Sequence, residues 1–297
     1  MAGVTILYVV ELATPQRDFF VGRSGEIEND VSVLTLADAS VHENVVLQST
    51  TGLEVALRVK RPAAPSAARI PVFLIVGGHR TGKDAVDLIG DRDDAAFAAI
   101  DYPYHGSRSL DGFWDYAAAT PAFQRAMLDT PPSLSLAVDW LLRQQWVDHG
   151  RIELLGVSLG VPFAAVGGAL DKRVSRVWLV HGGADNLSWV MHAGRHAIEN
   201  ETLRRYAART LLLLVYGHSF DTGSWIREIA PRPLVIVAAR DDERVPEQAR
   251  QPFIDAAGEP WVELVWTSGL HVDPRRPQII EELLNIVFER ALAAHDI

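Results

Sequence analysis

The sequence predicts one α/β domain built on a mostly parallel central sheet with helices on both faces. Short runs rich in Val, Ile and Leu alternate with longer stretches of helical spacing, which is the βαβ rhythm of a parallel sheet. The chain has 297 residues, enough for one large domain or for one domain carrying an insertion, and this length disfavours two equal domains. We therefore expect a single domain over residues 1–297.

Six apolar runs are expected to form the parallel strands, because each is short and the intervals between them leave room for crossover helices. They are Val72–Val76, Phe97–Ile100, Ile152–Leu155, Val177–Val180, Leu234–Val237 and Val262–Trp266. Before them, Val45–Leu47 and Leu53–Lys60 flank the turn residues Thr50-Thr51-Gly52. An antiparallel hairpin is therefore expected to start the sheet.

Two helices are predicted where proline precedes apolar residues at helical spacing, since proline fits the first helical turn. One begins at Pro131-Pro132 and runs through Trp146, and the other follows Pro277 and runs to Phe288. We interpret both apolar stripes as core rather than as a binding groove. The long interval 184–230 lies between two expected strands and holds helical, polar and aromatic segments, so it is interpreted as a small helical cap inserted in the domain.

Composition excludes several classes of function. The formal net charge is −10, which repels phosphate backbones and anionic lipid surfaces, so neither nucleic acid nor membrane is expected as a partner. With no cysteine, the chain has no disulfide, thiolate nucleophile or Cys-ligated metal site. The apolar runs are too short to span a bilayer. No Lys or Arg precedes the apolar stretch Val4–Val10, so a cytoplasmic location is favoured, while a clipped secreted or periplasmic form and the oligomeric state stay open.

The motif Gly156-Val157-Ser158-Leu159-Gly160 directly follows one expected strand and precedes Val161–Ala164, which suits a first helical turn. This strand–turn–helix context is that of a nucleophile elbow. The turn is tight, so a side chain two positions from the serine would collide with strand or helix. We therefore predict that Ser158 is held above the sheet as a nucleophile. A partial look-alike around Ser219 lacks the second glycine.

A serine hydroxyl needs a base to take its proton, and the base needs a carboxylate to orient it. Such groups are expected after later strands. Asp241 and Asp242 follow the strand Leu234–Val237, and His271 follows the strand Val262–Trp266. The order nucleophile, acid, histidine is thus present, with two candidates for the acid.

Two other patterns in the sequence could indicate different chemistry. The segment Gly77–Lys83 fits the first seven positions of a phosphate-binding loop, but Asp84 stands where Ser or Thr would hold magnesium. His192 and His196 have helical spacing, yet no Glu lies between them to form a zinc-protease motif. We therefore expect neither nucleotide binding nor a catalytic metal.

These motifs together resemble the α/β-hydrolase superfamily, in particular its carboxylesterase-like serine esterases, from about Val45 to the C-terminus. The segments Asp101–Ser107 and Ala230–Leu234 are similar to those after the family's fourth strand and before its acid-bearing strand. In related esterases the acid stands three residues before a Val-Pro pair, which selects Asp242 and leaves Asp241 as the alternative. The resemblance implies carboxylic ester hydrolysis, a small-molecule ester substrate and no cofactor.

The resemblance also implies an oxyanion hole. One donor is the backbone N–H of Leu159, and the second comes from the loop after the third strand. Where many relatives carry His-Gly, this chain has Gly77-Gly78, so His79 is the matching donor and Gly78 the alternative. The cap is expected to wall the acyl site and to limit it to short chains, with Trp189, Tyr206, Phe220 and Trp225 among its apolar side chains. The alternative is that these side chains only anchor the insertion to the body of the domain. Peptidase, thioesterase, acyltransferase and non-catalytic binding functions remain alternatives on the same fold.

Overall fold

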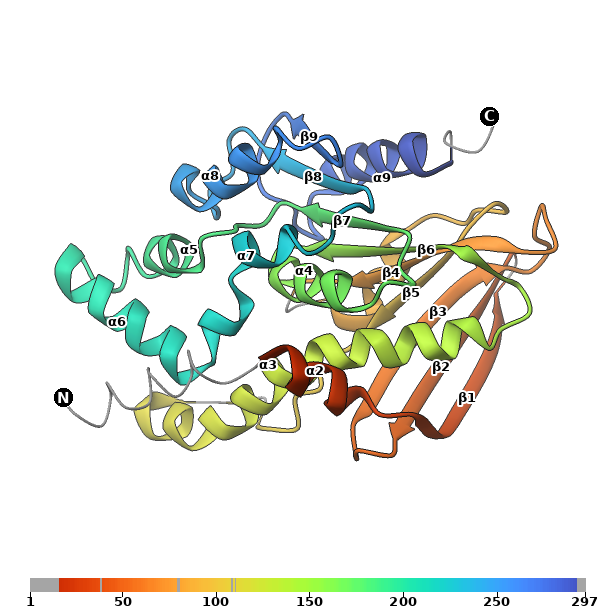
Figure 1. Cartoon of the computed structure of the whole chain (residues 1–297), viewed down its shortest axis with the longest axis horizontal. Helices are drawn as coiled ribbons and strands as arrows, with labels where there is room; N and C mark the ends of the chain where they lie inside the picture. The colour runs from red at the N-terminus through yellow and green to blue at the C-terminus, as the bar shows by residue number, and fades with distance from the viewer. Residues whose placement is uncertain (1–15, 38, 79–80, 108, 110, 293–297) are drawn as a thin grey trace.

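The computed structural model describes residues 16–37, 39–78, 81–107, 109 and 111–292 (Figure 1). Within this part the sheet has nine strands in the order β1-β2-β3-β5-β4-β6-β7-β8-β9. Their bounds are β1 Ile27–Ala37, β2 Ser40–Ser49, β3 Glu54–Pro62, β4 Ile70–Val76, β5 Ala96–Ile100, β6 Val147–Val157, β7 Arg176–Val180, β8 Leu234–Ala239 and β9 Val262–Thr267.

Strand pairing confirms the predicted sheet. The six strands from β5 to β9, including β4, pair in parallel, while β2 and β3 form the expected antiparallel hairpin and β3 joins β5 antiparallel. The edge strand β1 was not predicted. It pairs antiparallel with β2, and nearly all of its side chains are exposed, so no alternation of buried and exposed residues marked it in the sequence.

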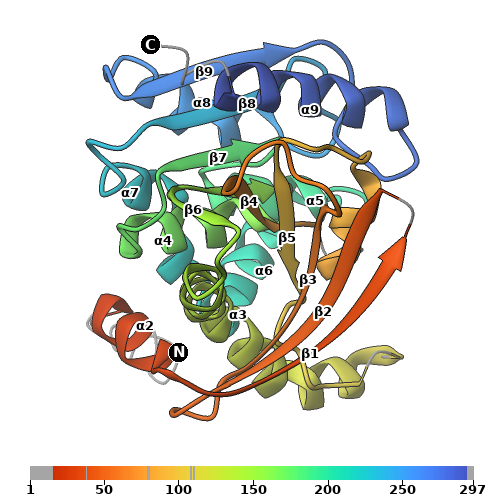
Figure 2. The ribbon, with the colours of Figure 1, turned by 90° about the vertical axis from the view of Figure 1, so that its right-hand side faces the viewer.

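Helices cover both faces of the sheet, as predicted, because side chains of one strand alternate between two cores. On β4, Leu74 packs in one core with α3 (Gly112–Leu142), α4 (Gly160–Leu170) and α7 (Thr222–Ile226). Its neighbour Ile75 packs in the other core with the 3-10 helix η1 (Gly82–Leu88) and α9 (Pro277–Leu292). Figure 2 shows α3 and α4 on one side of the sheet and α9 on the other.

The expected helix start at Pro131 is wrong. The helix α3 begins at Gly112 and contains Pro121 as well as Pro131-Pro132 in its interior. A proline inside a helix removes one backbone hydrogen bond. The side-chain hydroxyl groups on either side of the proline pair donate to backbone carbonyls one turn earlier, as Thr130 does to Ala126 O at 2.6 Å. By contrast, α9 begins at Pro277, as the sequence predicted.

Residues 184–230 contain helices, as their composition predicted. These are α5 (Asn186–Ala193), α6 (Glu201–Leu214), the 3-10 helix η2 (Gly217–Phe220) and α7. The other helices are α2 (Gln16–Ser24) at the start of the described chain and α8 (Glu247–Ala256) between β8 and β9. Figure 1 shows α5 and α6 beyond the carboxyl ends of the parallel strands. None of the helices in the described ranges has the length and apolar character that crossing a bilayer requires.

Candidate active site

Ser158 lies in a sharp turn between β6 and α4. Its φ is 54°, in the left-handed region that residues other than glycine seldom adopt. The backbone is tied on both sides, because Ser158 N donates to Val180 O at 2.9 Å and Ser158 O accepts from Val161 N at 3.0 Å. Strain of this kind, held by the surroundings, is typical of functional positions.

Both glycines of the motif are required by close packing. A Cβ atom at Gly160 would lie 1.9 Å from Val76 O. One at Gly156 would lie 2.5 Å from Ala164 Cβ. The collision that the sequence suggested two positions from the serine is therefore present on both sides.

Three side chains from the carboxyl ends of three strands form one hydrogen-bonded chain. Ser158 Oγ lies 2.8 Å from His271 Nε2, and His271 Nδ1 lies 2.8 Å from Asp242 Oδ2 and 3.0 Å from its Oδ1. The side chains of His271 and Asp242 are 0% and 1% exposed. The structure thus brings together the serine, the histidine and one of the two acids that the sequence proposed.

Asp242 differs from its neighbour Asp241 in burial and in bonding. Asp242 Oδ1 accepts the backbone N–H groups of Arg244 at 2.9 Å and Val245 at 2.8 Å, whereas Asp241 is exposed. Burial alone would raise the pKa of the Asp242 carboxyl, but hydrogen bonds and charge at His271 and the two backbone bonds outweigh it and lower that pKa. Asp242 therefore stays ionised beside the histidine.

The backbone of His271 is held by an ion pair that sequence reasoning missed. Its N–H donates to Glu243 Oε2 at 2.9 Å, and its carbonyl accepts from Arg276 at 2.7 Å. Glu243 and Arg276 also pair with each other at 2.8 Å. The one available signal was that Glu243 directly follows the acid, since Arg276 lies in a segment with no motif.

A second histidine also positions this loop. His181 directly follows β7, is 1% exposed, and its ring centroid lies 5.9 Å from that of His271. Its Nδ1 accepts the backbone N–H of Val272 at 3.0 Å, so the ring proton of the neutral form is on Nε2, which lies 3.0 Å from Thr267 Oγ1. Burial lowers the pKa of His181 to about 4. This agrees with the structural role that a histidine beside a strand suggests.

His181, Asp242 and His271 are the one group of three potential metal ligands in the described ranges, with ligand atoms within 4.8 Å of one another. A ligand needs a free lone pair on its donor atom. Both ring nitrogens of His181 have hydrogen-bond partners, and His271 bridges the serine and the carboxylate. All four ring nitrogens of the two histidines are therefore engaged in hydrogen bonds.

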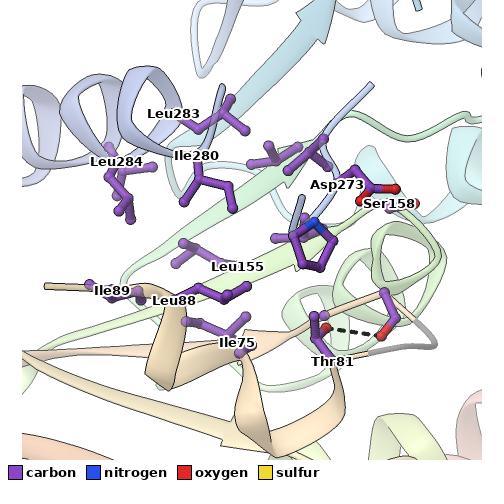
Figure 3. A pocket seen from close by; sticks show the side chains of 18 of the residues that line it. Ile75, Thr81, Leu88, Ile89, Leu155, Ser158, Asp273, Ile280, Leu283 and Leu284 are labelled. Atoms are coloured by element: carbon purple, nitrogen blue, oxygen red, sulfur yellow. Dashed lines mark hydrogen bonds between the residues drawn. The ribbon is translucent and has the colours of Figure 1, made fainter. Parts of the chain in front are cut away.

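A pocket of about 140 Å³ adjoins Ser158. Figure 3 shows its walls: Leu88 and Ile89 face Ile280, Leu283 and Leu284 across the cavity, with Ser158 at one end. We call this cavity the η1–α9 slot. The sequence had assigned the stripe of α9 to the core alone, but part of the stripe lines the slot.

The η1–α9 slot is separate from the expected cap, because none of the described residues that line it comes from 184–230. Two of the aromatic residues proposed as walls, Phe220 and Trp225, pack in the core beside Phe20. Tyr206, a third, is 65% exposed. The prediction that 184–230 walls the acyl site therefore stays a prediction.

The oxyanion-hole candidates are described only in part. His79 lies outside the described residues. Leu159 stands at the N-cap of α4, where backbone N–H groups have no partner within the helix. A Cβ at Gly78 would lie 3.9 Å from Ser158 Cβ, so the Gly78 backbone also borders the serine.

The segment that resembled a phosphate-binding loop has its lysine engaged elsewhere. Lys83 Nζ lies 2.8 Å from Asp101 Oδ2, and Lys83 N donates to Asp101 Oδ1 at 2.9 Å. Asp84 pairs with Arg58 at 2.9 Å. These contacts fasten η1 to the sheet.

Comparison with known proteins rests on structure. No family model matches the sequence, and no curated protein matches it significantly. The acetyl xylan esterase from Paenibacillus sp. R4 is similar with a TM-score of 0.62 and 14% identity, over 91% of this chain and 92% of that one. Acetyl xylan esterase 1 from Thermoanaerobacterium sp. JW/SL YS485 has a TM-score of 0.56 and 13% identity, over 87% of each chain. The chain has the α/β-hydrolase fold.

A third similar structure is the glucuronoyl esterase from Solibacter usitatus, with a TM-score of 0.53 and 15% identity over 91% of each chain. In the α/β-hydrolase fold, the nucleophile elbow and the later strand ends meet at one edge of the sheet. Ser158, Asp242 and His271 lie at those positions.

Proposed function

We propose that the protein is a serine hydrolase that cleaves carboxylic esters with short acyl groups. The observation that carries the proposal is the continuous hydrogen-bonded chain from Ser158 Oγ through His271 to the buried carboxylate of Asp242. These three hydrogen-bonded groups supply a nucleophile, a base and an anion that orients the base. The similar structures described above are all esterases, which supports esters as the substrate class.

The reaction proceeds in two halves. Ser158 Oγ attacks the ester carbonyl carbon while His271 Nε2 takes the serine proton, and Asp242 stabilises the imidazolium that forms. The tetrahedral intermediate then expels the alcohol, which receives that proton from His271. Water attacks the acyl-enzyme in the same way, releasing the acid and regenerating Ser158.

The negative oxygen of each intermediate needs donors that are already in place. We assign the first to the backbone N–H of Leu159, at the start of α4. The second comes from the loop after β4, with His79 as the donor that the resemblance implies and Gly78 as its neighbour.

We further propose that 184–230 is a small cap within a single domain. Its His192 lies 3.0 Å from the carbonyl oxygen of Glu243, in the loop that carries the acid. The amides of Ala184 and Asp185 donate to Ala249 O on α8 at 2.7 and 3.2 Å. These contacts support a segment fastened beside the site.

Hydrolysis of p-nitrophenyl acetate and butyrate by the purified chain tests the function. Ser158→Ala is expected to lower kcat by about 10³-fold or more while the protein stays folded. Ser219→Ala is the matched control, because this serine belongs to the partial look-alike motif and lies away from His271. Retained turnover in Ser158→Ala would reject the nucleophile. Absence of turnover in the wild-type protein with every ester would favour a non-catalytic binding function.

A further inference from the structure

The η1–α9 slot has walls of one chemical kind. Strand residues such as Ile75 and Leu155 form its floor, and apolar side chains of η1 and α9 form its sides. Its polar residues, Thr81, Arg244 and Asp273, are few, and Arg244 and Asp273 are paired with each other at 2.6 Å. An apolar group attached near Ser158 would therefore be buried in the slot, whereas a polar group would find few free hydrogen-bond partners there.

We propose that the η1–α9 slot binds the acyl group of the ester and selects apolar acyl chains of about six carbons, because its volume is close to that of a cavity that holds benzene. This inference rests on the proposed function, because it names the substrate class of the same site. It also moves the control of acyl length from the segment 184–230 to η1 and α9.

Deacylation explains why the slot takes the acyl group and not the alcohol. After the alcohol leaves, water must reach the acyl carbon and give a proton to His271. Water is held where it finds several polar partners, and an apolar slot supplies few. The leaving alcohol and the incoming water therefore use the solvent side of Ser158, whose side chain is only half-buried. The acyl chain stays in the slot throughout.

The size of the slot sets the length limit. Its volume of about 140 Å³ is close to that of an engineered apolar cavity of about 150 Å³ that binds benzene. The slot and a second cavity beside it share the lining residues Leu88, Ile89, Pro274, Ile280 and Leu284. A chain longer than the slot must displace some of these side chains, so activity is expected to fall beyond the optimum.

The test measures kcat/KM for two series of esters. The first varies the acyl group from acetyl to decanoyl with p-nitrophenol fixed, and the second varies the alcohol with acetyl fixed. In the acyl series kcat/KM should rise about fourfold per methylene up to about six carbons, since each buried methylene contributes a constant free energy. The alcohol series should vary much less.

Two variants change the slot from the half-buried face of α9. Ile280→Phe should lower the ratio of kcat/KM for hexanoyl esters to kcat/KM for acetyl esters at least tenfold. Leu284→Ala should move the optimum to longer chains. Tyr206→Ala, on the exposed part of 184–230, is the control and should leave the profile unchanged. Thermal unfolding of each variant verifies that it is folded at the assay temperature.

The outcomes separate the two proposals. If no ester is hydrolysed, or if Ser158→Ala retains turnover, the proposed function fails. If esters are hydrolysed through Ser158 but both α9 variants keep the wild-type acyl profile, the slot assignment alone is wrong. A shift of the acyl optimum in Trp189→Ala without a shift in the α9 variants would return the acyl site to 184–230. A shift in the alcohol series with an unchanged acyl series would place the alcohol in the slot.

Discussion

Removal of the Glu243 side chain should lower turnover although the residue touches neither Ser158 nor the ester. Glu243 and Arg276 hold the N–H and the carbonyl of His271, so together they fix the backbone from which the imidazole projects. We therefore regard Glu243 as a positioning residue.

The size of the effect follows from the two bonds. The His271 N–H bond to a carboxylate at 2.9 Å is charge-assisted, and such bonds contribute about 1.5–3 kcal/mol to stability. The Glu243 side chain is 36% exposed, so the ion pair with Arg276 adds about 1 kcal/mol at most. Glu243→Ala should therefore destabilise folding by about 1.5–4 kcal/mol. A displacement of the imidazole by about 1 Å would cost about 10²-fold in rate, so we expect kcat to fall about 10- to 100-fold.

A second substitution separates the two bonds. The amide oxygen of Glu243→Gln can still accept the His271 N–H, but its NH₂ group cannot accept from Arg276. This variant should lose less activity than Glu243→Ala. Arg276→Met removes the partner of the His271 carbonyl and should resemble Glu243→Gln. Glu259 is an exposed glutamate between α8 and β9, so Glu259→Ala controls for the loss of a negative charge.

Steady-state kinetics with p-nitrophenyl butyrate and urea unfolding together measure the effect. A positioning role predicts a lower kcat with KM nearly unchanged, because the ester is held by other residues. If Glu243→Ala loses stability but keeps kcat within twofold of wild type while fully folded, the ion pair only stabilises the loop and the positioning role is refuted.

Two further predictions concern the acid. Asp242→Asn should lower kcat about 10⁴-fold, because an amide does not hold the required tautomer of His271. The exposed Asp241 should tolerate the same change with kcat within about threefold of wild type. The reverse result in an ester assay would assign the role of the acid to Asp241. The pKa of Asp242 is lowered in the folded protein, so its charge contributes stability above the unfolded carboxyl pKa of about 3.9, and that contribution is lost as pH falls below it. Urea unfolding from pH 3 to 7 should therefore show a smaller acid loss in Asp242→Asn than in wild type, and equal losses would contradict this account.

The nucleophile elbow could be predicted from the local sequence, because its steric constraints are local. Gly160 faces Val76 O and Gly156 faces α4, and both contacts follow from a tight strand–turn–helix connection. The parallel strands were equally visible, since strands buried on both faces are continuous apolar runs. The exposed edge strand β1 and the internal prolines of α3 lacked such signals.

The η1–α9 slot could not be predicted from the sequence, because its existence depends on which helices lie opposite each other. The apolar stripe of α9 is visible in the sequence, but the slot exists only where this stripe stands apart from η1. The aromatic residues of 184–230 suggested a wall by their composition. In the structure Trp225 instead packs against Phe20, at the other end of the described chain.

The order of strands explains why the candidate site is assembled from distant residues. The strands β6, β7, β8 and β9 are neighbours in the sheet and run in parallel, so the polar groups that follow them come together at one edge. Those groups are Ser158, His181, Asp242 and His271. In the proposed mechanism a second cation beside His271 would oppose its protonation, so His181 must hold the loop without adding charge. Burial achieves this by lowering the pKa of His181 to about 4, so that at neutral pH its Nδ1 remains an acceptor for the Val272 N–H.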